Sequence, residues 1–151
     1  MADRTDVLLE LWKDQRAQAL QSENQRAALT NIVIVVVAAG LGFLAQKEHL
    51  RTGDLCVTVP MVLLGVYGTL TCWKYRERTS LHNRQIRTLY AAIADEHPEL
   101  GLRRVKSEPY ARHEARFART ARIRLYVLWM GLHIGVAVGG VFLSVWIVAA
   151  Q

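Results

Sequence analysis

Cysteines are few in this chain of 151 residues, and the two that occur bracket one apolar segment. Sixteen residues separate Cys56 from Cys72. In a helix that is about 24 Å, far beyond the reach of a disulfide bond. We therefore expect two free thiols, unless Cys56 pairs with a second subunit.

Catalytic and metal-binding motifs are also missing. No two histidines stand four residues apart, and neither a Cys-x-x-Cys sequence nor a glycine-rich phosphate loop occurs. The acidic residues Asp95, Glu96 and Glu99 stand at a predicted helix end, where they are expected to pair with arginines across the next turn. We expect no catalytic residue, no metal ion and no cofactor, and we predict that the protein is not an enzyme.

Proline is rare, and its three positions divide the chain into long helices. Proline removes a backbone donor and clashes with the preceding turn, so stretches without it favour uninterrupted helix. Pro60 lies near a predicted helix start, Pro98 ends that helix, and Pro109 fits a first helical turn. The prediction is three helices over about 5–46, 55–97 and 109–149, with a loop at 98–108.

Three long segments contain no Asp, Glu, Lys or Arg. They cover residues 27–46, 55–73 and 125–151, with 20, 19 and 27 residues. A bilayer core of about 30 Å needs roughly 20 apolar residues as helix, and the rest of the chain is too small to bury three such helices. The first segment follows a long charged stretch, so it is expected to stay as an anchor rather than be cleaved as a signal. The sequence predicts one all-α membrane domain over 1–151, with spans at about 29–46, 55–73 and 125–149.

Charge is unevenly distributed between the segments that join the spans. The net charge is −1 over residues 1–28, 0 over 46–54 and +7 over 74–124. Basic loops stay cytoplasmic, which predicts a multi-pass protein of the bacterial inner membrane with the N terminus inside and the C terminus outside. Basic side chains beside the spans are expected to contact anionic lipid headgroups: Lys74, Arg76, Arg78, Arg116, Arg119, Arg122 and Arg124. Nucleic acid is not an expected partner.

Each span is expected to continue into a cytoplasmic helix, over about 5–28, 74–97 and 109–124. Apolar residues spaced by three and four along these segments favour helices packed on one another. We expect a cytoplasmic three-helix bundle that is continuous with the membrane bundle. In the first helix, Gln15, Gln18 and Gln25 belong to a heptad pattern, which is either a polar oligomer seam or a solvated face.

Glycines recur at intervals of four in the third span, at Gly131, Gly135 and Gly139. This spacing, known as a glycine zipper, clears one face so that another helix can approach closely. Weaker versions are Ala38 with Gly42 in the first span and Gly65 with Gly68 in the second. These residues either pack the three spans of one subunit together or form the interface of a homo-oligomer.

His133 is the only ionisable side chain well inside a span. Eight residues of helix beyond Leu125 place it about 12 Å deep, and it should point about 200° away from the glycine face. An ionisable group at that depth is a candidate pore-lining or proton-sensing residue. Alternatively, it is a neutral histidine that hydrogen-bonds between helices. Polar residues in the other spans are expected partners for such bonds: Thr30, Asn31, Thr69 and Thr71.

The order of segments resembles a known family. A charged N-terminal helix, two spans joined by a nine-residue outer loop and a following cytoplasmic helix resemble the SLATT-type membrane effectors of bacterial defence systems. The resemblance covers residues 5–97 and is architectural, and the chain adds a third span. It implies a pore that damages the host membrane when a nucleotide-signalling or immune partner triggers it.

Two functions are compatible with these patterns. The first is a small oligomeric effector that forms a pore or disrupts the membrane and is gated by a cytoplasmic protein partner. The second is a structural or regulatory membrane subunit that conducts nothing and binds a partner through its cytoplasmic helices. Substitution of His133 should alter conduction in the first case and only stability in the second.

Overall fold

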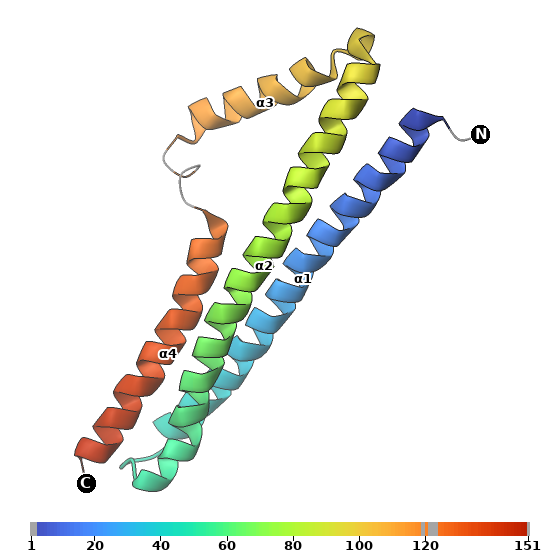
Figure 1. Ribbon diagram of the computed structural model, residues 1–151. Coiled ribbons are helices and arrows are strands. Elements are labelled where there is room, and N and C mark those ends of the chain that lie inside the picture. Colours follow the sequence, from blue (N-terminus) through green and yellow to red (C-terminus); the bar gives the residue numbers. More distant parts are fainter. Residues whose placement is uncertain (1–2, 119, 121–123, 151) are drawn as a thin grey trace. The chain divides into compact units, whose positions relative to one another are not determined.

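The computed structural model describes residues 3–118, 120 and 124–150, and this part of the chain is all-helical. It contains α1 (Arg4–Ala45), α2 (Leu55–Glu96), α3 (Leu102–Arg116) and α4 (Leu125–Ala149) (Figure 1). Short 3-10 turns at Thr52–Asp54 and Pro98–Leu100 precede α2 and α3. The prediction of an all-α chain with three long apolar helices is confirmed.

The chain divides into two compact units, to which α1 and α2 both contribute. One unit consists of Met1–Glu23 and Arg76–Arg124, and we name it the polar unit. The other consists of Asn24–Tyr75 and Leu125–Gln151, and we name it the apolar unit. That the whole chain is one domain stays a prediction.

The helices α1, α2 and α4 are long and apolar enough to cross a membrane. Within the most apolar window of each helix, only 22%, 28% and 17% of the residues are buried by the protein itself. Large side chains such as Val35, Leu63 and Phe142 are exposed. Apolar surface on this scale marks contact with a membrane or a partner and is not typical of a soluble monomer.

The apolar unit has a small core made by all three of its helices. Val33 and Val37 of α1 are one turn apart, so they share a face and pack with Met61 of α2. Partly buried side chains pack against this core: Val57, Leu64, Val136 and Leu143. A hydrogen bond of 2.8 Å from the Ser144 hydroxyl to the Thr58 hydroxyl joins α4 to α2.

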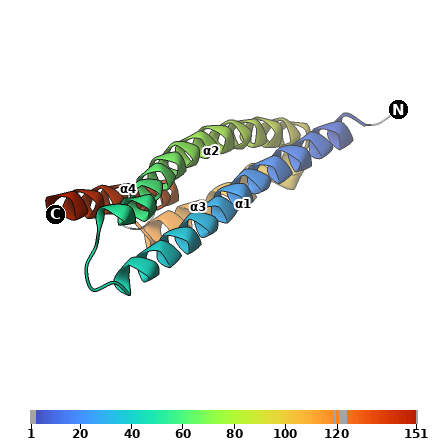
Figure 2. The ribbon, with the colours of Figure 1, turned by 90° about the horizontal axis from the view of Figure 1, so that it is seen from below.

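The connection between α1 and α2, seen at one end of both helices in Figure 2, is held by one buried carboxylate. Asp54, just before the apolar segment of α2, pairs with the Lys47 ammonium and accepts a hydrogen bond of 2.8 Å from the Arg51 amide. The hydrogen bond from Lys47, followed by the one from Arg51, holds the pKa of Asp54 below its ordinary value of 3.8. These contacts close the loop within a few residues.

In the polar unit, α1 and α2 pack through small and polar side chains. Ala19 and Ser22 of α1 and His82 of α2 are buried. The His82 ring is hydrogen-bonded through Nδ1 to the Gln15 side-chain oxygen at 2.7 Å. These contacts lie in the middle of the helix pair and leave little apolar core there.

Near the ends of the pair, the first turn of α1 is tied to the last turn of α2. The Thr5 hydroxyl donates to Glu96 at 3.0 Å, and Arg4 forms an ion pair of 2.8 Å with the same carboxylate. The polar unit is therefore fixed by ionic and hydrogen-bonding contacts at one end of the helix pair and by packing of small and polar side chains farther along it.

The predicted third helix differs from the observed one. The prediction of a loop over 98–108, with helix from 109 onward through the last span, is wrong. Helix α3 begins at Leu102 and ends at Arg116, and a separate helix, α4, begins at Leu125. Since no residue of α3 is buried, α3 also does not join α1 and α2 in a three-helix bundle around a shared core.

Local contacts explain where α3 starts and stops. Gly101 adopts φ +58°, a left-handed conformation that glycine accepts at a turn, so the chain can enter helix at once. The Pro109 ring sits inside the helix, where its missing N–H leaves one carbonyl without a partner. That loss is tolerable because α3 is exposed to water. Arg112 and Arg116, one turn apart, repel each other at the helix end, and Phe117 has left helical geometry.

Candidate functional site

The most distinctive side chain of the apolar unit is His133, which α4 places fully buried between α1 and α2. Its Nε2 lies 3.2 Å from the Thr30 hydroxyl of α1. That hydroxyl donates to the Arg26 carbonyl at 3.0 Å, so its oxygen is left to accept a bond from His133. The arrangement is satisfied by a neutral ring with its proton on Nε2.

The other side of the ring rests on the backbone of α2. A Cβ atom added to Gly68 would lie 2.1 Å from Nδ1 of His133, so only glycine leaves room for the ring. Nδ1 itself is buried and has no hydrogen-bond partner among the described residues. His133 therefore links all three helices of the apolar unit through one hydrogen bond and one close backbone contact.

A second pair of side chains joins the same two helices one turn away. Arg26 and Trp129 stand four residues before Thr30 and His133 in their respective helices. The Arg26 guanidinium lies 5.7 Å from the centroid of the Trp129 ring, a distance at which a cation is attracted to an aromatic face. Buried Nε atoms of both side chains have no hydrogen-bond partner among the described residues.

This cluster of Arg26, Thr30, Trp129 and His133 packs the three helices of the apolar unit against one another. Cys72 is also fully buried and lies beside Thr30. Within the described residues, no group of three His, Cys, Asp or Glu side chains is placed to hold a metal ion. The ring of His133 is enclosed by helices of its own chain, so it faces no open passage within the described apolar unit. A pore-lining or proton-sensing role for it stays a prediction.

The glycines of the apolar unit fall into two sets. The first set packs helices of this chain together. A Cβ at Gly65 would lie 2.5 Å from the backbone nitrogen of Ala137, and one at Gly140 would lie 2.9 Å from a methyl group of Val62. Together with Gly68, these positions bring α2 and α4 into backbone contact.

The second set is open. A Cβ at Gly131, Gly135 or Gly139 would meet no atom of another helix within 4 Å among the described residues. The weaker small-residue pair predicted in α1 is open too, because Ala38 is exposed and a Cβ at Gly42 meets nothing within 4 Å among the described residues. We name Gly131, Gly135 and Gly139 the open glycine face. Packing within the chain thus uses the glycines of α2 together with Gly140 and with Gly40, whose added Cβ would lie 2.9 Å from a methyl group of Val57. An oligomer interface at the open glycine face stays a prediction.

The predicted polar seam of α1 is partly used inside the chain. Gln15 contacts His82 of α2, whereas Gln18 donates to Asp14 of its own helix at 2.9 Å. Gln25 is exposed. The structure therefore places Gln15 at the α1–α2 contact, and the role of these glutamines in an oligomer stays a prediction.

Among the basic residues predicted to contact lipid, Lys74, Arg76 and Arg78 follow the second apolar segment, Arg124 precedes the third, and Arg116 ends α3. Lys74, Arg78, Arg116 and Arg124 are exposed, and Arg76 is half-buried. Arg119 and Arg122 lie outside the described residues. Contact with anionic headgroups stays a prediction.

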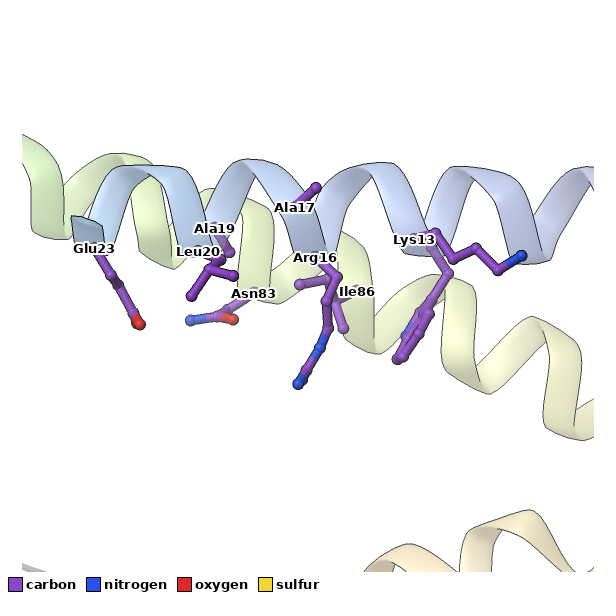
Figure 3. Close-up of a pocket in the computed structure, with 9 residues that line it drawn as sticks. Lys13, Arg16, Ala17, Ala19, Leu20, Glu23, Asn83 and Ile86 are labelled. Atoms are coloured by element: carbon purple, nitrogen blue, oxygen red, sulfur yellow. The ribbon is translucent and has the colours of Figure 1, made fainter. Parts of the chain in front are cut away.

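A shallow groove of about 400 Å³ lies between α1 and α2 in the polar unit (Figure 3). The guanidinium of Arg16 lies 5.7 Å from the centroid of the Trp12 ring, and Lys13 forms an ion pair of 2.7 Å with Glu10. Glu23 lies at the other end of the groove. Because both signs of charge line it, this groove does not select a ligand by charge.

The chain matches no protein-family model, no curated protein and no solved structure. Its own residues offer a sealed polar cluster around His133, an open glycine face on α4 and a groove between α1 and α2 in the polar unit.

Proposed function

We propose that the protein is a three-span integral membrane protein of the bacterial inner membrane, with its N terminus and polar unit in the cytoplasm. The length of α1, α2 and α4 and the exposure of their apolar side chains support insertion. The net charge of +7 over residues 74–124 supports a cytoplasmic polar unit. The C terminus would then lie at the outer surface.

The protein assembles into a homo-oligomer through the open glycine face, and this face is the observation that carries the proposal. Glycines at intervals of four allow close approach of a second helix, yet a Cβ at Gly131, Gly135 or Gly139 would meet no neighbouring helix within the described part of the chain. A second copy of α4 would fill the space that they leave. Inside the chain the same close approach is made by other glycines, so the open set is not needed for folding.

The assembled protein acts as a pore-forming or membrane-disrupting effector that a cytoplasmic partner gates through the polar unit. Because His133 is enclosed by its own chain, a single copy offers no passage along this residue. Conduction would therefore form between copies, around the oligomer axis, or after a rearrangement of the three helices.

The alternative is a structural or regulatory membrane subunit that conducts nothing. The hydrogen bond of 3.2 Å between His133 and Thr30 favours it, because it gives the one deep ionisable side chain a structural role. In this case the polar unit would bind a cytoplasmic protein partner, and the open glycine face would contact that partner's membrane helix or lipid.

The test is membrane potential during induced expression in a bacterial host, read with a potential-sensitive dye. Gly135→Leu fills the open glycine face, and Val141→Leu is a matched control at an exposed position of α4 on another side. We expect wild type and Val141→Leu to depolarise the membrane and cross-link as oligomers, and Gly135→Leu to lose both properties at equal abundance.

Unchanged potential with an intact wild-type oligomer would favour the non-conducting subunit. Depolarisation by Gly135→Leu at the wild-type level would contradict assembly through the open glycine face. His133→Ala adds a separate comparison. If this variant folds but no longer depolarises the membrane, His133 would take part in conduction.

A further inference from the structure

A second groove of the polar unit lies between the end of α2 and α3 and has a volume of about 540 Å³. Small-molecule sites are commonly about 300–1,000 Å³. Side chains at spacings of three and four on α3 form one wall, and the last turns of α2 form the other. The polar and aromatic side chains that line the groove are Arg87, Tyr90, Arg103, Lys106, Ser107, Tyr110 and Glu114.

Two cations of this groove have no carboxylate partner in the described chain. Arg87 makes no ion pair with any described residue, and the Lys106 ammonium lies 4.3 Å from the centroid of the Tyr90 ring rather than beside a carboxylate. Arg103, by contrast, is bridged to Asp95. An anion between Arg87 and Lys106 would complete the charge pairing of the groove.

Aromatic rings stand next to these cations. The Tyr90 hydroxyl donates to the Leu102 carbonyl, which fixes one wall of the groove. Tyr110 lies one turn beyond Lys106 in α3 and is exposed, so its ring is available for stacking. Glu114 lies eight residues beyond Lys106, about 12 Å along the helix. Lys106, Tyr110 and Glu114 thus follow one another at intervals of one turn on the α3 wall, and Arg87 stands one turn before Tyr90 on the α2 wall.

The described contacts that hold α3 to α2 lie near the start of α3, so a ligand could hold the rest of this helix. The described hydrogen bonds, ion pairs and ring contacts between α3 and α2 involve Leu102, Arg103 and Lys106, all in the first two turns of α3. No residue of α3 is buried. A ligand held between Arg87 and Tyr110 would fasten the second half of α3 to α2.

We propose that this groove binds a small organic phosphate that carries a flat ring, of the nucleoside-phosphate class. Arg87 and Lys106 hold the phosphate, and the ring stacks on Tyr110. Without a ligand, the Ser107 hydroxyl donates to the Arg104 carbonyl across 3.3 Å, longer than a usual O–H···O bond. When the ligand binds, this hydroxyl donates to the phosphate instead. Binding does not depend on whether the protein conducts, so the inference goes beyond the proposed function.

A lipid headgroup is the other source of phosphate. Arg87 and Lys106 stand 13 and 32 residues beyond Lys74, the first basic residue after the second apolar segment. Basic residues that serve headgroups concentrate next to the spans, as Lys74 and Arg78 do. The sequence position of the groove thus favours a soluble ligand.

The experiment is calorimetric titration of the purified full-length chain in detergent, with ATP in EDTA as the probe. Arg87→Ala and Lys106→Ala should each weaken ATP binding at least about tenfold. Tyr110→Ala should weaken ATP severalfold but leave inorganic tripolyphosphate unchanged, because only ATP has a ring to stack. Arg112→Ala is the matched control, since this exposed arginine of α3 does not line the groove, and it should stay within about twofold of wild type.

Three results would overturn the inference. One is an equal loss of ATP affinity in Arg112→Ala and Arg87→Ala, which would indicate that overall positive charge attracts ATP without a specific site. Another is tripolyphosphate binding as tightly as ATP to the wild type. The third is competition between ATP and vesicles of anionic lipid for the wild-type protein, together with weaker binding of these vesicles to Arg87→Ala. The lipid headgroup would then be the ligand.

Discussion

The Nε2 of His133 in α4 lies 3.2 Å from the hydroxyl oxygen of Thr30 in α1, and this bond crosses the interior of the apolar unit. It gives Nε2 of the buried ring its hydrogen-bond partner, so the effect of replacing either residue should depend on the other. The bond and the glycine under the ring are open to direct tests of stability.

Thr30→Val should lower the free energy of unfolding by about 1 kcal/mol, in the range of hydrogen bonds between membrane helices. His133→Ala should lower it by about 2 to 4 kcal/mol, because a cavity is added to the lost bond. The measurement is unfolding of the purified protein by SDS titration. In the His133→Ala background Thr30→Val should have a smaller effect; equal effects in both backgrounds would show that the two side chains are not coupled. Thr71→Val is the control, since its hydroxyl donates to a carbonyl of its own helix.

Gly68→Ala and Gly65→Ala should each destabilise the apolar unit by roughly 1 to 3 kcal/mol, because the new methyl group meets the His133 ring or the α4 backbone. Gly135→Ala should leave stability unchanged or raise it slightly, since the new methyl group meets no other helix among the described residues and alanine favours helix. Thermal unfolding followed by circular dichroism compares the three. Equal loss in Gly135→Ala would place the open glycine face inside the fold.

Asp54 predicts a dependence of stability on acid. Its pKa is lowered in the folded chain by Lys47 and the Arg51 amide, so the carboxylate stabilises the fold above the unfolded pKa of about 4. That contribution is lost as the pH falls from there through the folded pKa. The melting temperature of wild type should exceed that of Asp54→Asn at pH 7, and the gap should close below about pH 4. Glu48→Gln, which replaces an exposed carboxylate, is the control. A difference in melting temperature between wild type and Asp54→Asn that persists in acid would show that packing causes it.

The two cysteines report on orientation. Cys56 is exposed at the start of α2 and Cys72 is buried. A membrane-impermeant maleimide added from the outer side of the inner membrane should label wild type but not Cys56→Ser. Labelling should reach Cys72 only after denaturation. Labelling of Cys56 solely in inverted vesicles would reverse the proposed topology.

The long helices and one of their ends could be predicted from sequence, because the signals are local. The uncharged runs at 27–46, 55–73 and 125–151 are long enough to require helices, and Pro98 ends α2 at Glu96 as expected. The direction of His133 also follows from helix periodicity, since it is buried while Gly131 and Gly135 are exposed.

The features that could not be predicted from the sequence depend on tertiary contacts. The sequence places Pro109 in a first helical turn, but the Tyr90 hydroxyl donates to the Leu102 carbonyl and Gly101 turns the chain. The helix therefore starts seven residues earlier, at Leu102. The regular spacing of glycines likewise does not reveal which of them pack. Gly68 is enclosed because the His133 ring of another helix needs its space, and that partner cannot be inferred from the glycine pattern alone.

The separation of the glycines into two sets has an evolutionary consequence. Folding depends on Gly65, Gly68 and Gly140, where almost any larger side chain collides with a neighbouring helix. The open glycine face carries no such restriction, so mutation can enlarge its side chains one at a time without unfolding the protomer. Selection could therefore change how many copies associate, or with which relative they associate, while the protomer is inherited intact.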